Sequence, residues 1–169
     1  MLKKIRITES LKASILIANY NNGQYLKECI DSIKKQNYKN TEIIVHDDAS
    51  SDNSIKKLNE YKNIKIIKNK KRGRYGSYNQ MNAFYRAFKK SKGEILFLLD
   101  SDDFFKENKI KFITNFFIKN KKISSLFDLP IYKYKNELKF IKNKKKIISN
   151  YWPYIPPQSC ITIKRDDFI

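Results

Sequence analysis

Three carboxylates lie close together near the middle of the chain. Asp100, Asp102 and Asp103 fall within four consecutive residues, directly after the apolar run 95–99. Side chains of like charge at this density repel one another unless a cation joins them. Carboxylate oxygens suit hard ions such as Mg²⁺ or Mn²⁺, and Mg²⁺ is usually held by one or two carboxylates together with substrate phosphates. The pattern therefore predicts a divalent metal site at Asp102 and Asp100.

A second acidic pair, Asp47 and Asp48, follows the predicted strand 42–46, whose sequence is Glu-Ile-Ile-Val-His. A carboxylate at the end of a strand can accept a hydrogen bond from a nucleobase N–H or a ribose hydroxyl. The same residue type also caps helices, so a purely structural role is the alternative. Because Ser50 or Asp52 can cap the segment that follows, we assign Asp48 to a ligand.

Two further polar segments have a possible binding role and a plain structural alternative. Residues 19–22 contain Asn19, Tyr20 and Asn21, which could offer backbone groups and an aromatic face to a nucleobase or form an ordinary turn. The basic loop 71–76 contains Arg74 and precedes a predicted helix, whose N-terminus could meet a diphosphate. Its alternative is a surface loop without a ligand.

The elements that must position these residues alternate between strand and helix. Such alternation predicts an α/β fold with a mostly parallel sheet, right-handed crossovers and helices on both faces. Ligands of such sheets bind at the carboxyl ends of the strands, and each polar cluster above follows the end of a predicted strand. We expect strands at 13–18, 42–46, 64–67 and 94–99, and helices at 24–36, 53–61, 77–90 and 106–119.

The pattern changes after residue 121. In the predicted helix 77–90, Tyr78, Met81, Tyr85 and Phe88 recur on one stripe, which is typical of an amphipathic helix. Residues 122–169 show no helical periodicity, and their pattern predicts a short mixed β segment. We therefore divide the chain into residues 1–123 and residues 124–169. The second part has predicted strands at 124–129, 131–134, 137–141 and 159–164, and an aromatic loop at 151–157 in which Trp152 and Tyr154 could stack on a sugar or form local core.

The chain carries a formal net charge of +19 over 169 residues. Nucleic-acid binding, attraction to an anionic membrane surface and compositional drift toward Lys all fit this excess. Lys far outnumbers Arg, whereas recognition of phosphates and bases favours the Arg fork, so we expect no specific nucleic-acid partner. No apolar run approaches the roughly 18 residues that span a bilayer. Cys29 and Cys160 show no pairing motif and predict reduced thiols, as in the cytoplasm.

Taken together, the motifs resemble those of the family 2 glycosyltransferases, which have the GT-A fold. Residues 13–21 resemble the family's opening strand, and Ser32, Ile33 and Gln36 resemble its first-helix signature. Residues 42–52 resemble its nucleotide motif, and Gly93-Glu94 followed by 98–103 resembles its DxD motif. The chain has Ala18-Asn19 where the family often has Pro-Thr, and Ala49 where the family often has Gly.

The resemblance implies a nucleoside-diphosphate sugar donor, commonly a UDP-sugar, and a Rossmann-like GT-A sheet. Asp48 would contact the base, Asp100 would lie near the ribose or metal, and Asp102 would be the main ligand of Mg²⁺ or Mn²⁺. Transfer would invert the anomeric centre and would use a carboxylate general base. The nucleotide-sugar site would comprise Ala18, Asn19, Tyr20, Asn21, Asp47, Asp48, Arg74, Asp100 and Ser101.

The resemblance also implies a division of labour between the two parts of the chain. Residues 1–123 would bind the donor, and residues 124–169 would begin an acceptor-side region that is incomplete. The family's general base normally follows the DxD motif at a greater distance than Asp166 or Asp167, so we expect it beyond Ile169 in an apparently truncated chain. The acceptor would be a glycan or a lipid-linked molecule. We expect the protein to be cytoplasmic and to lie peripherally at the inner face of the membrane.

Two other functional classes stay open. A nucleotidyltransferase can share a similar sheet and metal carboxylates, although it would normally have a basic, glycine-rich loop after its first strand, and residues 19–23 contain no basic side chain. A non-catalytic module that binds a nucleotide-sugar or a nucleic acid would use the same fold or the excess positive charge. Dependence of UDP binding on a metal and on Asp102 separates these classes.

Overall fold

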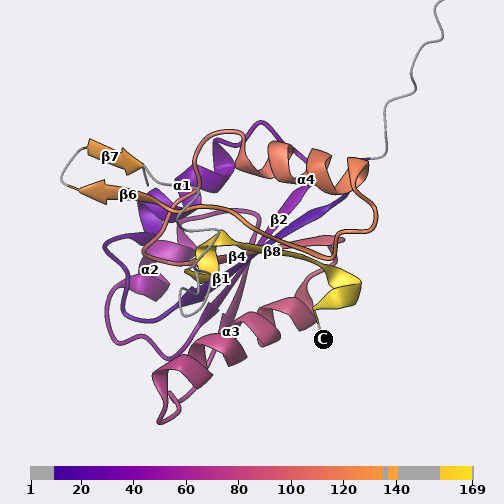
Figure 1. The fold of residues 1–169 in the computed structure, drawn as a ribbon. Helices are drawn as coiled ribbons and strands as arrows, with labels where there is room; N and C mark the ends of the chain where they lie inside the picture. The colour runs from indigo at the N-terminus through magenta and orange to yellow at the C-terminus, as the bar shows by residue number, and fades with distance from the viewer. Residues whose placement is uncertain (1–9, 135–136, 141–156, 169) are drawn as a thin grey trace, which may run out of the picture.

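Four parallel strands form the centre of the fold, as the alternating pattern predicts. The computed structural model describes residues 10–134, 137–140 and 157–168. One sheet has six strands in the order β3-β2-β1-β4-β8-β5, with β8 antiparallel to both of its neighbours. The predicted α/β class with a mostly parallel sheet is confirmed (Figure 1). The strands are β1 (Ala13–Asn19), β2 (Thr41–Asp47), β3 (Ile64–Lys68), β4 (Ile95–Asp100), β5 (Ser125–Phe127) and β8 (Ile161–Lys164).

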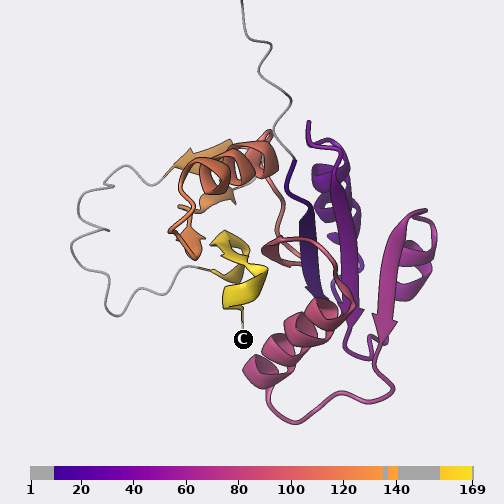
Figure 2. The ribbon, with the colours of Figure 1, turned by 90° about the vertical axis from the view of Figure 1, so that its right-hand side faces the viewer.

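Helices cover both faces of this sheet. Figure 1 shows α3 (Gly76–Lys90) below the strands and α1 (Leu26–Lys34) and α4 (Lys109–Lys119) above them. Successive side chains of a strand point to opposite faces, so the strands feed two separate cores. One core joins alternate residues of β1, β2 and β4 to α1, α4 and the short α2 (Ser54–Asn59). The other joins the intervening residues to α3, with Ile161 and Phe168 packed at its border. Figure 2 shows the sheet and α3 from the side.

The buried face of α3 differs from the stripe that the sequence suggests. Of the predicted residues only Phe88 is buried, whereas Tyr78, Met81 and Tyr85 are exposed. The core face instead carries Ala83, Phe84, Ala87 and Phe88. Two alanines let the helix approach the sheet closely, and Phe84 fills the space beneath it. The periodicity of large apolar residues therefore identified the helix but not its inward side.

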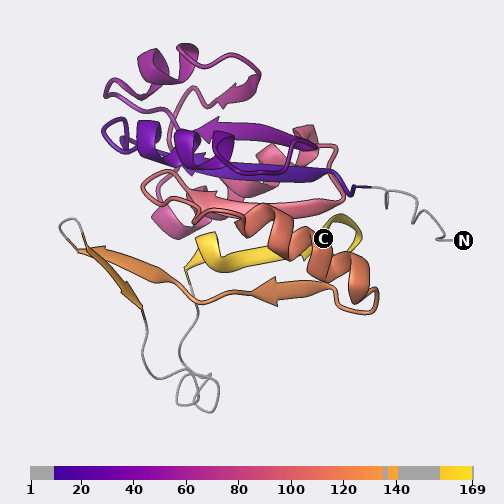
Figure 3. The same ribbon diagram turned by 90° about the horizontal axis from the view of Figure 1, so that it is seen from above.

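The C-terminal part of the chain joins the main sheet. The strand β8 pairs with β4 in the register Leu96↔Ile163, between two 3₁₀ helices, η1 (Gln158–Cys160) and η2 (Arg165–Asp167). Two strands, β6 (Ile131–Tyr134) and β7 (Glu137–Phe140), form a separate hairpin, which Figure 3 shows projecting from one end of the sheet.

Several smaller expectations can be compared with the structure. The helix expected from residue 106 begins at Lys109, because Asn108 has a φ of 61° and so breaks the helical backbone. Cys29 and Cys160 are both free and buried. Trp152 and Tyr154 lie outside the described residues. Within the described ranges, no helix combines the length and hydropathy needed to cross a bilayer.

Candidate functional site

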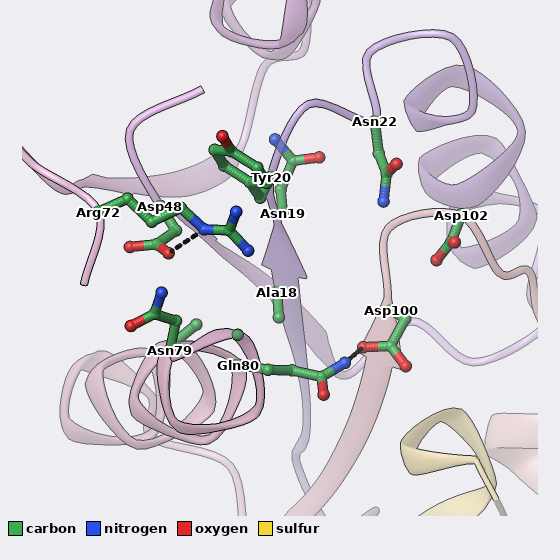
Figure 4. A pocket seen from close by; sticks show the side chains of 12 residues that line it. Ala18, Asn19, Tyr20, Asn22, Asp48, Arg72, Asn79, Gln80, Asp100 and Asp102 are labelled. Carbon is green, nitrogen blue, oxygen red and sulfur yellow. Dashed lines mark hydrogen bonds and ion pairs between the residues drawn. The ribbon is translucent and has the colours of Figure 1, made fainter. Parts of the chain in front are cut away.

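A cavity opens where the order of the strands reverses. The chain runs from β1 through β2 to β3 on one side of the sheet, and β4 then pairs on the other side of β1. Such a reversal leaves a crevice at the carboxyl ends of the strands. The cavity has a volume of about 340 Å³, and Figure 4 shows it between the ends of β1 and β4 and the first turns of α3. Its lining residues are Ala18, Asn19, Tyr20, Asn22, Asp48, Arg72, Gly76, Asn79, Gln80, Ala83, Asp100 and Asp102.

The acidic turn after β4 forms one wall of this cavity. Gln80 Nε2, from α3, donates a hydrogen bond of 2.6 Å to Asp100 Oδ1. The backbone N–H of Asp100 donates to Ser159 Oγ at 3.0 Å, and that hydroxyl donates to Asp103 Oδ2 at 2.5 Å. Asp102 makes no hydrogen bond within the described part of the chain. Gln80 and Ser159 therefore hold the turn in place and leave Asp102 available to a ligand.

The Asp100 carboxyl titrates far from its ordinary range. Burial raises its pKa to about 6; the hydrogen bond from Gln80 opposes this shift, and the charges of Asp103 and Asp102 reinforce it. A buried carboxylate that faces other carboxylates is costly to ionise. A cation beside Asp100 and Asp102 would remove that cost, so the residues present suit a hard divalent ion.

The opposite wall carries Asp48, which is 5% exposed. Its carboxylate accepts a hydrogen bond of 2.8 Å from Asn69 Nδ2 and pairs with Arg72 Nε at 3.3 Å. The Arg72 guanidinium also lies over the Tyr20 ring, 3.4 Å from its centroid. Figure 4 shows Asp48 and Asp102 on opposite sides of the same hollow. One wall thus carries Tyr20 and Asp48, both in contact with Arg72, and the other carries the carboxylates of Asp100 and Asp102.

Three of the predicted site residues, Asp47, Asn21 and Ser101, support the frame of the cavity instead of lining it. Asp47 is 1% exposed and accepts hydrogen bonds from Asn19 Nδ2 at 2.7 Å and from the Ser50 hydroxyl at 2.6 Å. Asn21 Oδ1 accepts from the Ser51 backbone at 2.8 Å. Ser101 is fully buried and accepts from Asn22 Nδ2 at 3.0 Å.

The loop after β2 contains a strained residue. Ala49 has a φ of 59°, in the left-handed region that favours glycine. Asp52, three residues on, accepts hydrogen bonds from the backbone of Gly23 and Ser54, so it braces the start of α2. Asp48 lines the cavity, and its assignment to a ligand stays a prediction.

The basic loop enters the cavity through a different residue from the predicted one. Arg74 does not line the cavity, and its guanidinium lies 5.6 Å from the Tyr75 ring centroid. Arg72, two residues earlier, makes the contacts with Asp48 and Tyr20. Sequence reasoning also missed the α3 residues Asn79 and Gln80, although the amides in its first turns could have suggested them.

A cation bound at Asp100 and Asp102 would need ligands in addition to these two carboxylates. Within the described ranges, no three His, Cys, Asp or Glu side chains converge on one point. Mg²⁺ and related ions are commonly completed by water and by phosphate oxygens of a substrate. The pair Asp100 and Asp102 therefore fits a cation that is shared with a phosphorylated ligand.

Comparisons with known proteins show which sequences and structures this chain resembles. The model of the family described as Glycosyl transferase family 2 matches residues 14–165. WfgD of Escherichia coli, a "UDP-Glc:alpha-D-GlcNAc-diphosphoundecaprenol beta-1,3-glucosyltransferase", is 34% identical over 110 residues, which are 63% of this chain and 41% of WfgD.

Solved structures share the fold. Staphylococcus aureus TarS (residues 1–349) superposes with a TM-score of 0.68 at 22% identity, over 92% of this chain and 47% of TarS. The mannosyltransferase PcManGT of Pyrobaculum calidifontis, in complex with GDP-Man and Mn²⁺, gives 0.65 at 16% identity, over 94% of this chain and 46% of that one. This chain therefore spans less than half the length of each of these proteins.

Proposed function

Because the chain belongs to glycosyl transferase family 2, we propose that it binds the donor of an enzyme that transfers a sugar from a UDP-sugar to a glycan or lipid-linked acceptor. One observation carries this proposal: a single cavity joins Tyr20 and Asp48 to Asp100 and Asp102. A nucleotide-sugar has the matching order of groups, with a base at one end and a diphosphate followed by the sugar at the other. Residues 1–123 would form the donor region, and residues 124–169 would begin the acceptor side.

The protein groups have distinct tasks in this scheme. Tyr20 offers a stacking face to the base, and Asp48 accepts a hydrogen bond from it once Arg72 moves aside or shares the carboxylate. The first turn of α3, which contributes Gly76 to the cavity, presents backbone N–H groups to the diphosphate. Gln80 keeps Asp100 turned toward the same place.

Mg²⁺ or Mn²⁺ would be held by Asp102 and Asp100. When bound, such an ion neutralises charge on the diphosphate and on the departing nucleotide. The proposed transfer inverts the anomeric centre. The two carboxylates bind the metal in this scheme, so they are not assigned to proton transfer.

Relatives support the choice of donor and acceptor. WfgD is named for a UDP-glucose donor and a diphosphoundecaprenol-linked acceptor, and TarS has been solved in complex with UDP-GlcNAc. PcManGT was solved with GDP-Man and Mn²⁺. This complex supports a divalent metal in the proposed site, whereas its base is guanine, so the titration below compares UDP with GDP. UDP is proposed here because the relative of higher sequence identity is named for it.

Calorimetric titration tests the proposal. UDP is titrated into the protein with Mn²⁺ present and with Mn²⁺ removed by a chelator, and GDP and UMP serve as comparison ligands. We expect UDP to bind in the presence of Mn²⁺, with a loss of about tenfold or more when the metal is removed. UMP should bind more weakly than UDP because it lacks the second phosphate. Equal binding of UDP with and without metal, or no binding at all, contradicts the proposal.

A further inference from the structure

The outward face of α3 is unusually apolar for a solvent-exposed helix. Tyr78, Met81 and Tyr85 are 69%, 52% and 47% exposed. They follow one another at spacings of three and four residues and so form one stripe. Tyr75, which precedes the helix, extends the stripe and is also exposed. We call these four residues the tyrosine face.

The tyrosine face lies opposite the donor cavity on the same helix. Gly76, Asn79, Gln80 and Ala83 line the cavity, and they fall on the other side of α3 from Tyr78 and Tyr85 at about 100° per residue. Figure 1 shows α3 as the outermost layer on its side of the sheet, with no other described helix or strand beyond it. The two sides of α3 therefore face different surroundings, the cavity on one side and solvent on the other.

The surrounding segment is wholly basic. Residues 61–93 contain 11 Lys and Arg residues and no Asp or Glu. Two of these cations pair with carboxylates from other segments, Lys65 with Glu42 and Arg72 with Asp48. Others lie beside the tyrosine face: Lys89 Nζ is 5.5 Å from the Tyr85 ring centroid, and Arg74 lies over Tyr75.

We propose that the tyrosine face docks on the surface of an anionic lipid bilayer. Tyrosine is enriched where a protein meets the membrane interface, because its ring is apolar and its hydroxyl is wet. Basic side chains around such a face are attracted to anionic headgroups. A second copy of the chain is a poor alternative occupant, because it would bring one uniformly positive surface against another.

The docked orientation gives the donor cavity a defined height. An α-helix with its side chains is about 10–12 Å in diameter, so α3 lying flat on the bilayer places the cavity roughly one helix diameter above the headgroups. A sugar acceptor anchored in the bilayer would then reach the cavity. Delivery of an acceptor to the cavity rests on the proposed function, whereas the docking itself is inferred from the composition and exposure of α3.

Vesicle co-sedimentation tests the docking. The 169-residue chain is mixed with vesicles of phosphatidylcholine alone or of phosphatidylcholine with phosphatidylglycerol, at low and at physiological salt. The test variant combines Tyr78→Ser, Met81→Ser and Tyr85→Ser. The matched control combines Phe112→Ser, Phe127→Ser and Leu138→Ser, whose side chains are 72%, 48% and 47% exposed elsewhere on the molecule.

We expect binding to the anionic vesicles only, weakened by salt. The test variant should lose about tenfold in the partition constant, and the control variant should keep that of the unsubstituted chain. A third variant with Lys89→Gln and Lys90→Gln should lose about fivefold for each charge removed. Thermal unfolding of every variant verifies that it folds.

Three outcomes overturn the proposal. They are no binding to anionic vesicles at low salt, an equal loss in the test and control variants, and tighter capture of single-stranded RNA that depends on the same tyrosines. UDP titration on the same samples separates this proposal from the previous one. Vesicle binding without UDP binding breaks the proposed function and leaves the docking face intact, and the reverse result breaks only the docking face.

Discussion

Buried carboxylates at the two ends of the parallel sheet differ in how many hydrogen-bond donors surround them. At the amino ends of the strands, Glu42 accepts hydrogen bonds from Ser14 Oγ at 2.7 Å, from Lys65 Nζ at 2.8 Å and from the Lys92 backbone. At the carboxyl ends, the side chain of Asp100 receives one hydrogen bond, from Gln80. The carboxylates of Asp102 and Asp103 lie nearby and add negative charge.

The pKa values record this difference. Burial would raise the pKa of the Glu42 carboxyl, but its hydrogen bonds and the nearby charge of Lys12 outweigh burial and lower the pKa to about 2. Burial raises the pKa of Asp100 to about 6 because its single donor is outweighed. The ionised carboxylate of Glu42, with several donors, stabilises the fold, whereas that of Asp100, with one donor and two acidic neighbours, is costly to ionise without a cation or further donors.

Of the substitutions that test this difference between the two ends of the sheet, Asp102→Asn should have the largest effect, and it should act on ligand affinity. We expect Asp102→Asn to weaken Mn²⁺-dependent UDP binding by about 100-fold, because the neutral amide replaces a charged ligand of the metal. Folding should be unchanged, since Asp102 makes no hydrogen bond within the described residues. Calorimetric titration measures the loss, and Asp166→Asn, on an exposed turn, is the matched control. An affinity within threefold of the unsubstituted chain would place the metal elsewhere.

Substitution of Glu42 should act on stability instead of on ligand binding. Because the folded-state pKa of Glu42 lies below its unfolded value, its ionised form stabilises the fold above about pH 4.5, and that contribution is lost as the pH falls toward about 2. Glu42→Gln should therefore lower the free energy of unfolding by about 2 kcal/mol at pH 7, with a smaller difference at pH 3. Urea unfolding at both values measures this. The same loss at pH 3 and pH 7 would show that charge is not the cause.

Substitution of Asp100 should change stability with the opposite sign. Its folded-state pKa lies above the unfolded value, so ionisation destabilises the fold, fully above about pH 6 and progressively less as the pH falls toward 4. Asp100→Asn should raise the free energy of unfolding by about 1 kcal/mol at pH 7.5, while it weakens metal-dependent UDP binding by less than Asp102→Asn does. Urea unfolding at pH 7.5 and pH 4 measures the gain. If the variant is less stable than the parent at pH 7.5, ionised Asp100 does not destabilise the fold and the proposed difference between Asp100 and Glu42 is wrong.

Substitution of Lys65 should have the smallest effect. Its side chain is 48% exposed, and exposed ion pairs contribute about 0.5 kcal/mol. Lys65→Gln should lower the free energy of unfolding by about that amount, because Ser14 and the Lys92 backbone still hold Glu42. Urea unfolding with and without 0.5 M salt measures it, and salt should reduce the difference between variant and parent. A loss as large as that of Glu42→Gln would mean that Lys65 alone satisfies the carboxylate.

The sequence was sufficient for the frame of the molecule. Short, largely apolar segments followed by polar clusters predict β1, β2 and β4 within about one residue, because a buried parallel strand is rich in apolar residues. The same clusters predict the carboxyl edge of the sheet, and thus the shared cavity of Asp48, Asp100 and Asp102.

The remaining features depend on contacts that local patterns do not encode. The insertion of β8 beside β4 is set by pairing over more than 60 residues of separation, and its four residues carry a weak signal. The choice of Arg72 over Arg74 depends on the path of an irregular loop. The inward side of α3 was misread because two alanines and Phe84, not the larger tyrosines, meet the sheet.

The reversal of strand order around β1 also bears on how such proteins diversify. The hollow arises from the path of the backbone, so no individual side chain is needed to create it. Loops that border the hollow can lengthen or exchange residues while the strands behind them keep their register. Natural selection can therefore alter ligand preference piece by piece at the rim, without rebuilding the scaffold each time.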